Sequence, residues 1–270
     1  MNGDADVVRS RSNSALKMAR SVGKGRELGR VLVEGERLLS DALRAGHAPE
    51  LVLVQESNVA SFADVLEGVD VRICAEGLLD GVGSVKTSPG IAAVFPEPAA
   101  AEWSVVDAGQ VSAASLVVCV AGVADPGNLG ALARVAEAAG ASALVVTPGG
   151  ARPFGPKALR GSMGSLFRIP VVLPVSVVEA LESLTDAGYE HFLAATRGGD
   201  SMHDCRFAPL TALWVTSETG ETPDELGAAH PVTIPMFGEV ESLNVTVAGA
   251  LLAYAASGRI LKRTVEGDRL

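Results

Sequence analysis

Two groups of polar residues in this chain have the spacing of a site rather than of an ordinary surface. Asp125, Asn128 and Arg134 follow the pattern D-P-x-N-x-G-x-x-x-R directly after an apolar run. Ser242 and Asn244 stand just before another apolar run near the opposite end of the chain. Amides and hydroxyls orient a substrate through hydrogen bonds, and a guanidinium stabilises negative charge because it is planar and positive. These residues are therefore suited to hold a substrate and to stabilise an alkoxide or a phosphate.

A simpler structural explanation exists for the first group. Asp125 and Asn128 are common helix-capping residues, and Arg134 alone is an ordinary surface charge. That explanation fits most such sequences, but it leaves the complete spacing to chance. The segment is not a dinucleotide-binding loop, because it lacks the Gly-x-Gly-x-x-Gly motif.

The elements that have to position these residues alternate between strands and helices. In the second half of the chain, apolar runs typical of buried parallel strands are separated by helical segments. We expect strands at 115–121, 143–146, 170–173, 191–195, 213–216 and 232–234, and helices at 128–140, 176–187 and 242–257. This order predicts an α/β fold with a doubly wound parallel sheet, and such folds bind ligands at the rim of the sheet.

The first part of the chain predicts a smaller α/β domain. We expect strands at 30–34, 50–54, 70–74 and 90–95, and helices at 13–25, 36–45, 59–66 and around Leu78. Residues 1–11 have little apolar content and predict a flexible tail. A tract rich in Pro, Ala and small polar residues at 97–114 predicts a linker. The two predicted domains are therefore residues 12–96 and 115–270.

Charge is distributed unevenly along the chain. The net charge of −10 argues against a nucleic-acid partner, because neutralising phosphates requires local Lys and Arg. Two basic runs change that judgement, one near the N-terminus and one in the middle of the chain, although either run is also compatible with a solvated face. The candidate RNA-binding residues from these runs are Arg9, Arg11, Lys17, Arg20, Lys24, Arg26, Arg160 and Arg168.

Composition indicates a folded protein, with 48% apolar and 20% charged residues. No apolar run reaches the roughly 18–20 residues that cross a bilayer, and the N-terminus does not resemble a secretion signal, so we expect a cytoplasmic protein without a membrane partner. The three cysteines are far apart, and none has a metal-ligand spacing to a histidine, so no metal site is predicted. The local group His203-Asp204-Cys205 is interpreted as a surface loop.

Three motifs in the second half resemble those of the SpoU-type RNA ribose methyltransferases of the SPOUT superfamily. The pattern from Asp125 to Arg134 is similar to the first motif, and the segment 234–248 is similar to the third. The second motif departs from the family pattern, because residues 216–218 are Thr-Ser-Glu where a Gly-Asn-Glu-Gly-like turn is usual. The carboxylate is kept, but Thr216 adds a side chain where a cofactor approaches the backbone, which puts cofactor affinity in question.

The resemblance implies a fold, a cofactor and partners. SpoU-type catalytic domains form a deep trefoil knot that holds S-adenosyl-L-methionine (AdoMet), and they act as homodimers. Segments 31–35 and 87–95 also resemble the N-terminal substrate-binding domain of many of these enzymes, which is like an RNA-binding ribosomal protein. The resemblance thus implies an RNA substrate-binding domain at 12–96 and a knotted methyltransferase domain at 115–270.

The resemblance also implies roles for individual residues. The expected catalytic residues are Arg134, Asn128, Glu218, Ser242 and Asn244. The expected cofactor-binding residues are Thr196, Thr216, Ser217, Ile234, Met236 and Leu243. Some schemes for the family make the arginine a base, but an arginine side chain stays protonated in proteins, so we expect an electrostatic role for Arg134.

The expected activity is AdoMet-dependent methylation of a ribose 2′-hydroxyl in RNA. The additional N-terminal domain favours ribosomal RNA as the target, and transfer RNA stays an alternative. A second alternative is a non-catalytic RNA-binding or ribosome assembly factor on the same fold. The altered second motif and the acidic net charge motivate that alternative.

Overall fold

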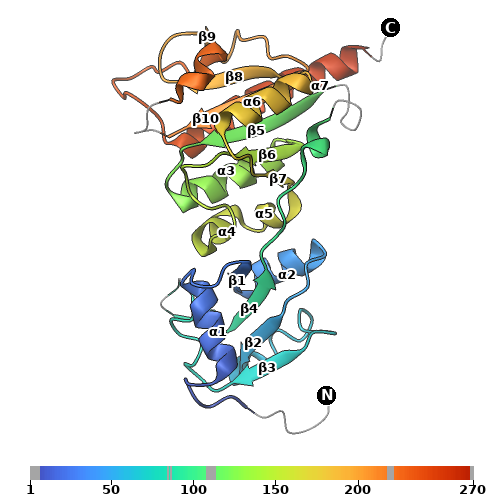
Figure 1. The fold of residues 1–270 in the computed structure, drawn as a ribbon, viewed down its shortest axis with the longest axis vertical. Coiled ribbons are helices and arrows are strands. Elements are labelled where there is room, and N and C mark those ends of the chain that lie inside the picture. Colours follow the sequence, from blue (N-terminus) through green and yellow to red (C-terminus); the bar gives the residue numbers. More distant parts are fainter. Residues whose placement is uncertain (1–6, 84, 86, 108–113, 218–221, 268–270) are drawn as a thin grey trace. The chain divides into compact units, whose positions relative to one another are not determined.

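The computed structural model of this chain describes residues 7–83, 85, 87–107, 114–217 and 222–267 (Figure 1). Contacts divide the chain into two compact units. Unit 1 comprises Met1–Ala99 and Phe154–Phe167, and unit 2 comprises Ala100–Pro153 and Arg168–Leu270. Among the helices that the structure describes, none combines the length and the apolarity needed to span a bilayer.

Unit 1 is built on a four-stranded mixed sheet. Its strands are β1 (Arg30–Glu34), β2 (Leu51–Gln55), β3 (Val71–Cys74) and β4 (Ile91–Pro96). Its helices are α1 (Ser14–Gly23), α2 (Glu36–Arg44), the 3₁₀ helix η1 (Glu56–Asn58) and α4 (Pro156–Ser162). The strand order is β1-β4-β2-β3, with β4 antiparallel to β1 and β2, and β2 parallel to β3. The four predicted strands and the first two predicted helices are confirmed.

Helix α1 covers one face of this sheet. Leu16, Ala19 and Val22 recur at every third position of α1 and are buried together with Leu32 of β1 and Leu53 of β2. This apolar stripe has the spacing of an amphipathic helix, which is why the sequence predicts α1 correctly.

Two predicted helices of unit 1 are wrong. The segment 59–66 forms turns after η1, and so do the residues around Leu78. Within 59–66 only Phe62 is buried, so a helix there would have no apolar face to pack against the sheet. Short helices without such packing are marginal in water.

The described parts of the predicted tail and linker are ordered. The Val8 N–H donates to the Ile73 carbonyl at 2.8 Å, which fastens the segment after residue 6 beside β3. In unit 2, Trp103 opens the 3₁₀ helix η2 (Trp103–Val106), and its Nε1–H donates to Glu179 Oε1 at 3.1 Å. Val106 is buried in the core of unit 2. The Pro- and Ala-rich composition of 97–114 did not indicate that Trp103 and Val106 pack in unit 2.

Unit 2 contains a seven-stranded sheet. Its strands are β5 (Ser115–Ala121), β6 (Ala143–Val146), β7 (Val171–Val172), β8 (Glu190–Ala195), β9 (Asp200–Ser201), β10 (Leu210–Thr216) and β11 (His230–Thr233). The order is β7-β6-β5-β10-β8-β11-β9, and every neighbouring pair is parallel. Its helices are α3 (Pro126–Ala138), α6 (Val177–Asp186), η3 (Asp224–Ala228) and α7 (Val245–Gly267). The short helix α5 (Ser165–Arg168) is divided, because only its last residue, Arg168, belongs to unit 2. The predicted parallel sheet is confirmed.

Helices cover both faces of this sheet. Leu184 of α6 packs in one core cluster with Trp214 of β10. The adjacent residue Val215 points to the other face, because side chains alternate along a strand. There, a Cβ added to Gly249 of α7 would lie 2.6 Å from Leu132 Cδ2 of α3 and 3.6 Å from Val215 Cγ2. Helices α3 and α7 therefore share the face opposite α6, as a doubly wound sheet requires.

Two further features differ from the sequence-based expectation. Residues 154–167, expected within the catalytic domain, pack with unit 1 as α4 and most of α5. Helix α4 ends at Met163, which has a left-handed φ of 50°. The final helix starts at Val245, three residues later than predicted, because Asn244 takes the capping position.

Candidate functional site

Unit 2 has a pocket of about 370 Å³ at the carboxyl ends of its central strands. Thr196 and Arg197 follow β8, Thr216 ends β10 and Ser217 follows it, and Ile234 follows β11. Parallel α/β sheets bind ligands at this edge, because the loops that leave the strands converge there. A pocket of this volume falls within the range of small-molecule sites, about 300–1,000 Å³.

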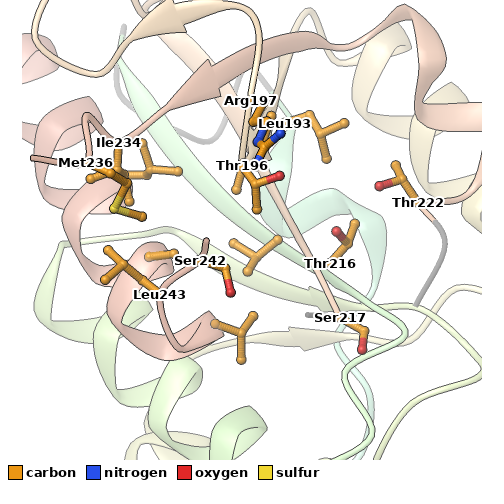
Figure 2. A pocket seen from close by; sticks show the side chains of 16 residues that line it. Leu193, Thr196, Arg197, Thr216, Ser217, Thr222, Ile234, Met236, Ser242 and Leu243 are labelled. Carbon is orange, nitrogen blue, oxygen red and sulfur yellow. The ribbon is translucent and has the colours of Figure 1, made fainter. Parts of the chain in front are cut away.

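The walls of the pocket differ in character. Figure 2 shows the apolar side chains of Ile234, Met236 and Leu243 gathered on one side, with Thr216 and Ser217 opposite them. The first three belong to the segment between β11 and α7, which has no helix or strand of its own. One wall therefore suits a flat apolar group, and the other offers hydroxyls and main-chain groups.

The six residues predicted to bind a cofactor all line this one pocket, and so does Ser242. The sequence did not single out Arg197, which brings an exposed positive charge to the rim. Arg197 directly precedes two glycines after a predicted strand, and that turn signal was available in the sequence.

A small polar network joins the first and third motifs. The Asn244 Nδ2 amide donates to Asn128 Oδ1 at 3.4 Å, and the Thr246 hydroxyl lies 3.3 Å from the Asn128 carbonyl. The Asn128 N–H donates to Asp125 Oδ1 at 2.9 Å, so Asp125 caps α3. The capping interpretation and the site interpretation of this motif are therefore compatible. Residues 116 positions apart in sequence meet here.

Helices α3 and α7 are fastened to each other at both ends. Asn244 Oδ1 accepts a hydrogen bond from the Thr246 N–H at 3.0 Å and so caps α7 beside the start of α3. At the other end of α3, the Ser257 hydroxyl donates to the Ala139 carbonyl at 2.6 Å, and the Tyr254 hydroxyl donates to the Ala138 carbonyl at 3.3 Å. The two motifs are thus held at a fixed separation.

Arg134 is exposed and is not among the residues that line the pocket. It lies six residues after Asn128 on α3, so its direction differs by about 120° around the helix axis. Of the expected catalytic residues that the structure describes, only Ser242 lines the pocket. Asn244 lies between the lining residues Leu243 and Val245 and is hydrogen-bonded to Asn128. Glu218, the remaining predicted catalytic residue, falls outside the described residues.

The strands beneath the pocket are joined by a partly buried polar contact. The Trp214 Nε1–H of β10 donates to His191 Nδ1 of β8 at 3.0 Å, and His191 Nε2 lies 2.9 Å from the Thr185 hydroxyl. Burial lowers the pKa of His191 below its ordinary value of 6.5. The imidazole is therefore kept neutral, with Nδ1 as an acceptor.

The basic residues proposed for RNA binding differ in their exposure and in their hydrogen bonds. Five of the first run have exposed side chains: Arg9, Arg11, Lys17, Lys24 and Arg26. Arg20 differs, because its guanidinium donates to the carbonyls of Arg11 at 3.0 Å and Leu78 at 3.1 Å. Arg20 therefore stabilises the fold of unit 1 through these hydrogen bonds.

The second basic run is divided between the units. Arg160 is exposed on α4 in unit 1. Arg168 in unit 2 forms a two-pronged ion pair with Glu137 of α3, with Nε–Oε1 at 2.6 Å and Nη2–Oε2 at 2.9 Å. This pair offsets the charge of Arg168, so its contribution to an RNA surface is reduced.

Comparison with known proteins gives consistent results. The sequence profile of the SpoU rRNA Methylase family matches residues 115–254. The 23S rRNA (guanosine(2553)-2′-O)-methyltransferase RlmP of Bacillus subtilis (strain 168) is 31% identical over 230 residues, which cover 84% of this chain and 88% of RlmP.

Solved structures agree with this relationship. The SpoU methyltransferase AviRb from Streptomyces viridochromogenes, in complex with AdoMet, has a TM-score of 0.79 and 26% identity, covering 92% of this chain and 98% of that chain. The AdoMet-bound rRNA methyltransferase from Sinorhizobium meliloti has a TM-score of 0.82 over 96% of this chain and 99% of that chain, and at 23% identity it shows the shared fold.

The matched segment contains the pocket, the polar network and Arg134. It covers more than half of the chain, and the similarity to RlmP extends through most of unit 1 as well. The chain belongs to the SpoU rRNA Methylase family.

Proposed function

We propose that this protein transfers the methyl group of AdoMet to the 2′-hydroxyl of a ribose in ribosomal RNA. The observation that carries the proposal is the meeting of the first and third motifs through the Asn244 to Asn128 hydrogen bond, next to the pocket that Ser242 and Leu243 line. The names of similar proteins support it, because RlmP is a 23S rRNA guanosine 2′-O-methyltransferase and AviRb was solved with AdoMet.

The pocket fits a nucleoside cofactor. Ile234, Met236 and Leu243 form an apolar wall for the adenine, and the main-chain groups near Thr196 and Ser217 suit its polar edges. When bound, AdoMet supplies a methyl group activated by its sulfonium, so that the carbon–sulfur bond breaks as the carbon–oxygen bond forms. Thr216 lines this pocket and leaves room in it, which supports cofactor binding despite the altered second motif.

The side chains of this protein orient the substrate and stabilise the developing charge. Asn128, Ser242 and Asn244 orient the ribose hydroxyl, which places two reacting groups in line. Arg134 stabilises the developing alkoxide or holds the adjacent phosphate, and the hydroxyl proton leaves through phosphate or water. In the proposed arrangement, Glu218 holds Asn128 or Arg134 in place.

Unit 1 is proposed to bind the RNA substrate. Its exposed basic residues on and around α1, such as Lys17, Lys24 and Arg26, offer positive charge to phosphates on an otherwise acidic protein. The resemblance of this unit to an RNA-binding ribosomal protein belongs to the same proposal. Because the proposed substrate is ribosomal RNA, the proposed place of action is the cytoplasm.

We also propose a homodimer. Val247, Leu251 and Tyr254 form an apolar stripe along α7, and their side chains are 47%, 40% and 56% exposed. Such a stripe is an unusual feature for a monomer surface and suits a two-fold contact. The dimer would also allow Arg134, which is not among the described residues that line the pocket of its own chain, to reach the pocket of the partner.

The deep trefoil knot expected from the family is part of the proposal. Helix α7 contacts β5, β8 and β10 as well as α3, which is consistent with a C-terminal segment drawn through the fold. A threaded segment would hold residues 234–244 in place and so preorganise the pocket wall.

Mapping ribose methylation in ribosomal RNA tests the proposed activity. We expect cells that lack the gene to lose 2′-O-methylation at one ribosomal position, and the native gene to restore it. A gene encoding Asn244→Ala should not restore it. Identical methylation maps with and without the gene would contradict the proposal.

A further inference from the structure

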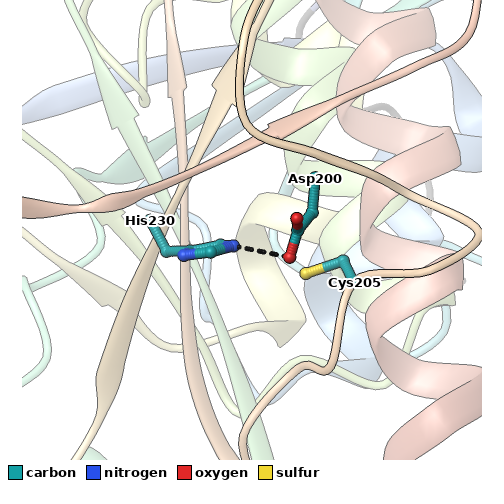
Figure 3. Close-up of side chains that lie close together, drawn as sticks. All are labelled: Asp200, Cys205 and His230. Atoms are coloured by element: carbon teal, nitrogen blue, oxygen red, sulfur yellow. Dashed lines mark hydrogen bonds and ion pairs between the residues drawn. The ribbon is translucent and has the colours of Figure 1, made fainter.

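Outside the pocket, three side chains with metal-binding groups converge in unit 2. These are Asp200 of β9, Cys205 in the following loop, and His230 at the start of β11. Figure 3 shows the Cys205 sulfur and the His230 ring nitrogen both directed at the carboxylate of Asp200. His230 Nε2 lies 3.1 Å from Asp200 Oδ2, and one ligand atom from each residue lies within 4.8 Å of the other two.

The backbone around this cluster is closely constrained. Asp200 pairs with Val232 in the parallel ladder between β9 and β11. Gly199, at a left-handed φ of 78°, leaves no room for a Cβ, which would stand 2.0 Å from the Pro231 carbonyl oxygen. The Cys205 N–H donates to the Ser201 carbonyl at 2.8 Å. The three ligand groups are therefore held near one another by main-chain contacts, as a preformed binding site requires.

We propose that Asp200, Cys205 and His230 bind one divalent transition-metal ion, with zinc the best match. A thiolate, an imidazole and a carboxylate form a ligand set that zinc prefers, whereas calcium and magnesium prefer oxygen ligands alone. Ligand atoms on one tetrahedral zinc lie about 3.3–3.6 Å apart, so the 3.1 Å between His230 Nε2 and Asp200 Oδ2 has to widen only slightly. The Cys205 sulfur lies within 4.8 Å of the other two ligand atoms, and rotation of the half-exposed His230 and Asp200 side chains allows the remaining approach.

The environment is suitable for such an ion. Cys205 is fully buried and supplies the inner ligand, while the side chains of His230 and Asp200 are 48% and 56% exposed. Water can therefore complete the coordination from the solvent side. On binding, the Cys205 thiol releases its proton to solvent, and the metal takes the place of the contact between His230 and Asp200.

The position of the cluster suggests what the metal would do. Asp200 lies three residues after Arg197, and His230 lies four residues before Ile234, and both of those residues line the pocket. A metal would join the starts of β9 and β11 directly. The ion would thus stabilise the pocket wall without contacting the reacting groups.

This proposal departs from the expectation of no metal site. The sequence pattern draws attention to His203-Asp204-Cys205, whereas the structure combines Cys205 with two residues from separate strands. The register of β9 against β11 creates the cluster, and that register is not visible as a spacing in the sequence.

Cobalt titration of the full chain tests the site. The protein, freed of any histidine tag and dialysed against a chelator, is titrated with Co²⁺ while its absorption spectrum is recorded. We expect visible bands and a near-ultraviolet thiolate-to-cobalt band that saturate at one equivalent and disappear when Zn²⁺ is added. Cys205→Ser should remove the thiolate band, and Asp200→Asn or His230→Gln should weaken binding at least about tenfold.

The neighbours in the same loop provide matched controls. His203→Gln and Asp204→Asn should bind Co²⁺ as the native protein does. Because His230 and Asp200 are half exposed, their variants keep the core intact, which circular dichroism checks, so the test does not depend on Cys205→Ser folding. Zn²⁺ should raise the melting temperature of the native protein and of His203→Gln, but not of His230→Gln. Absence of a saturable band, an unchanged band in Cys205→Ser, or loss of binding in His203→Gln would overturn the proposal.

Discussion

At the scale of residues, the site depends on short polar side chains that belong to two helix starts. Asn128 and Asn244 are connected by a hydrogen bond, and each also lies at the beginning of its helix. Capping fixes the backbone there, so the amides are held in one orientation before any substrate arrives. The same residues therefore serve stability and proposed catalysis.

Arg134→Ala should lower the methylation rate constant by at least about 100-fold, because it removes charge stabilisation from the transition state. Affinity for AdoMet should stay unchanged, since Arg134 does not line the pocket. Single-turnover assays measure the first quantity, and calorimetry measures the second. A variant that methylates at the native rate would show that the first motif has been assigned incorrectly.

At the scale of elements, helices α3 and α7 determine where the two motifs meet. Their contact depends on Gly249, because its missing side chain lets Leu132 of α3 lie against the backbone of α7. Strands β8 and β10 below the pocket depend in turn on the hydrogen bond from Trp214 to His191. Both contacts predict effects on stability.

Gly249→Ala should lower the free energy of unfolding by about 1–3 kcal/mol, because the new methyl group displaces Leu132 from a packed position. Gly258→Ala is the matched control in the same helix. An added Cβ there meets nothing within 4 Å, so that variant should be more stable by about 0.5–1 kcal/mol. Urea denaturation of both variants measures the difference, and equal effects would contradict the proposed packing.

Acid should destabilise unit 2 through His191. Its pKa is lowered in the folded state, so the unfolded chain binds a proton more readily. The stabilising contribution of the neutral ring is complete above pH 6.5 and decreases as the pH falls below 6.5 toward the lowered folded pKa.

His191→Gln keeps an acceptor for Trp214 but cannot titrate. Between about pH 7.5 and about pH 5 it should lose less stability than the native protein. Chemical denaturation at both pH values measures this. Equal losses in the two proteins would contradict a neutral, partly buried His191.

At the scale of the whole molecule, the features that the sequence predicts correctly are those with strong apolar periodicity or a motif spacing. The strand at 115–121 and the pocket residues after 234 are examples, because apolar runs and Pro and Gly turns have local causes. Contacts that arise from the pairing of distant strands could not be predicted in this way. The cluster around Asp200 depends on strand order and register, which leave no local pattern. The turn signal beside Arg197 is visible in the sequence, but it does not show that Arg197 lies at a pocket rim. The packing of segment 154–167 with unit 1 also could not be predicted, because its packing partner is far away in sequence.

The proposed homodimer makes a prediction about Arg134. If this residue acts on the partner's pocket, mixed dimers of Arg134→Ala and Ser242→Ala contain one intact site, although each variant alone is inactive. Random mixing should then restore about a quarter of the native activity, since half of the dimers are mixed and each has one working site of two. Leu251→Asp, which places a charge in the apolar stripe, should prevent both dimer formation and this rescue. Inactive mixtures would place Arg134 in its own chain's site.

The central claim is that this protein methylates a ribose hydroxyl, and the fate of a labelled methyl group tests it most directly. Unmodified ribosomal RNA is incubated with the protein and methyl-labelled AdoMet, digested to nucleosides and analysed by mass spectrometry. The label should appear in a single 2′-O-methylated nucleoside with the native protein, and Asn244→Ala should give none. Label on a base, or no label with the native protein, would contradict the claim.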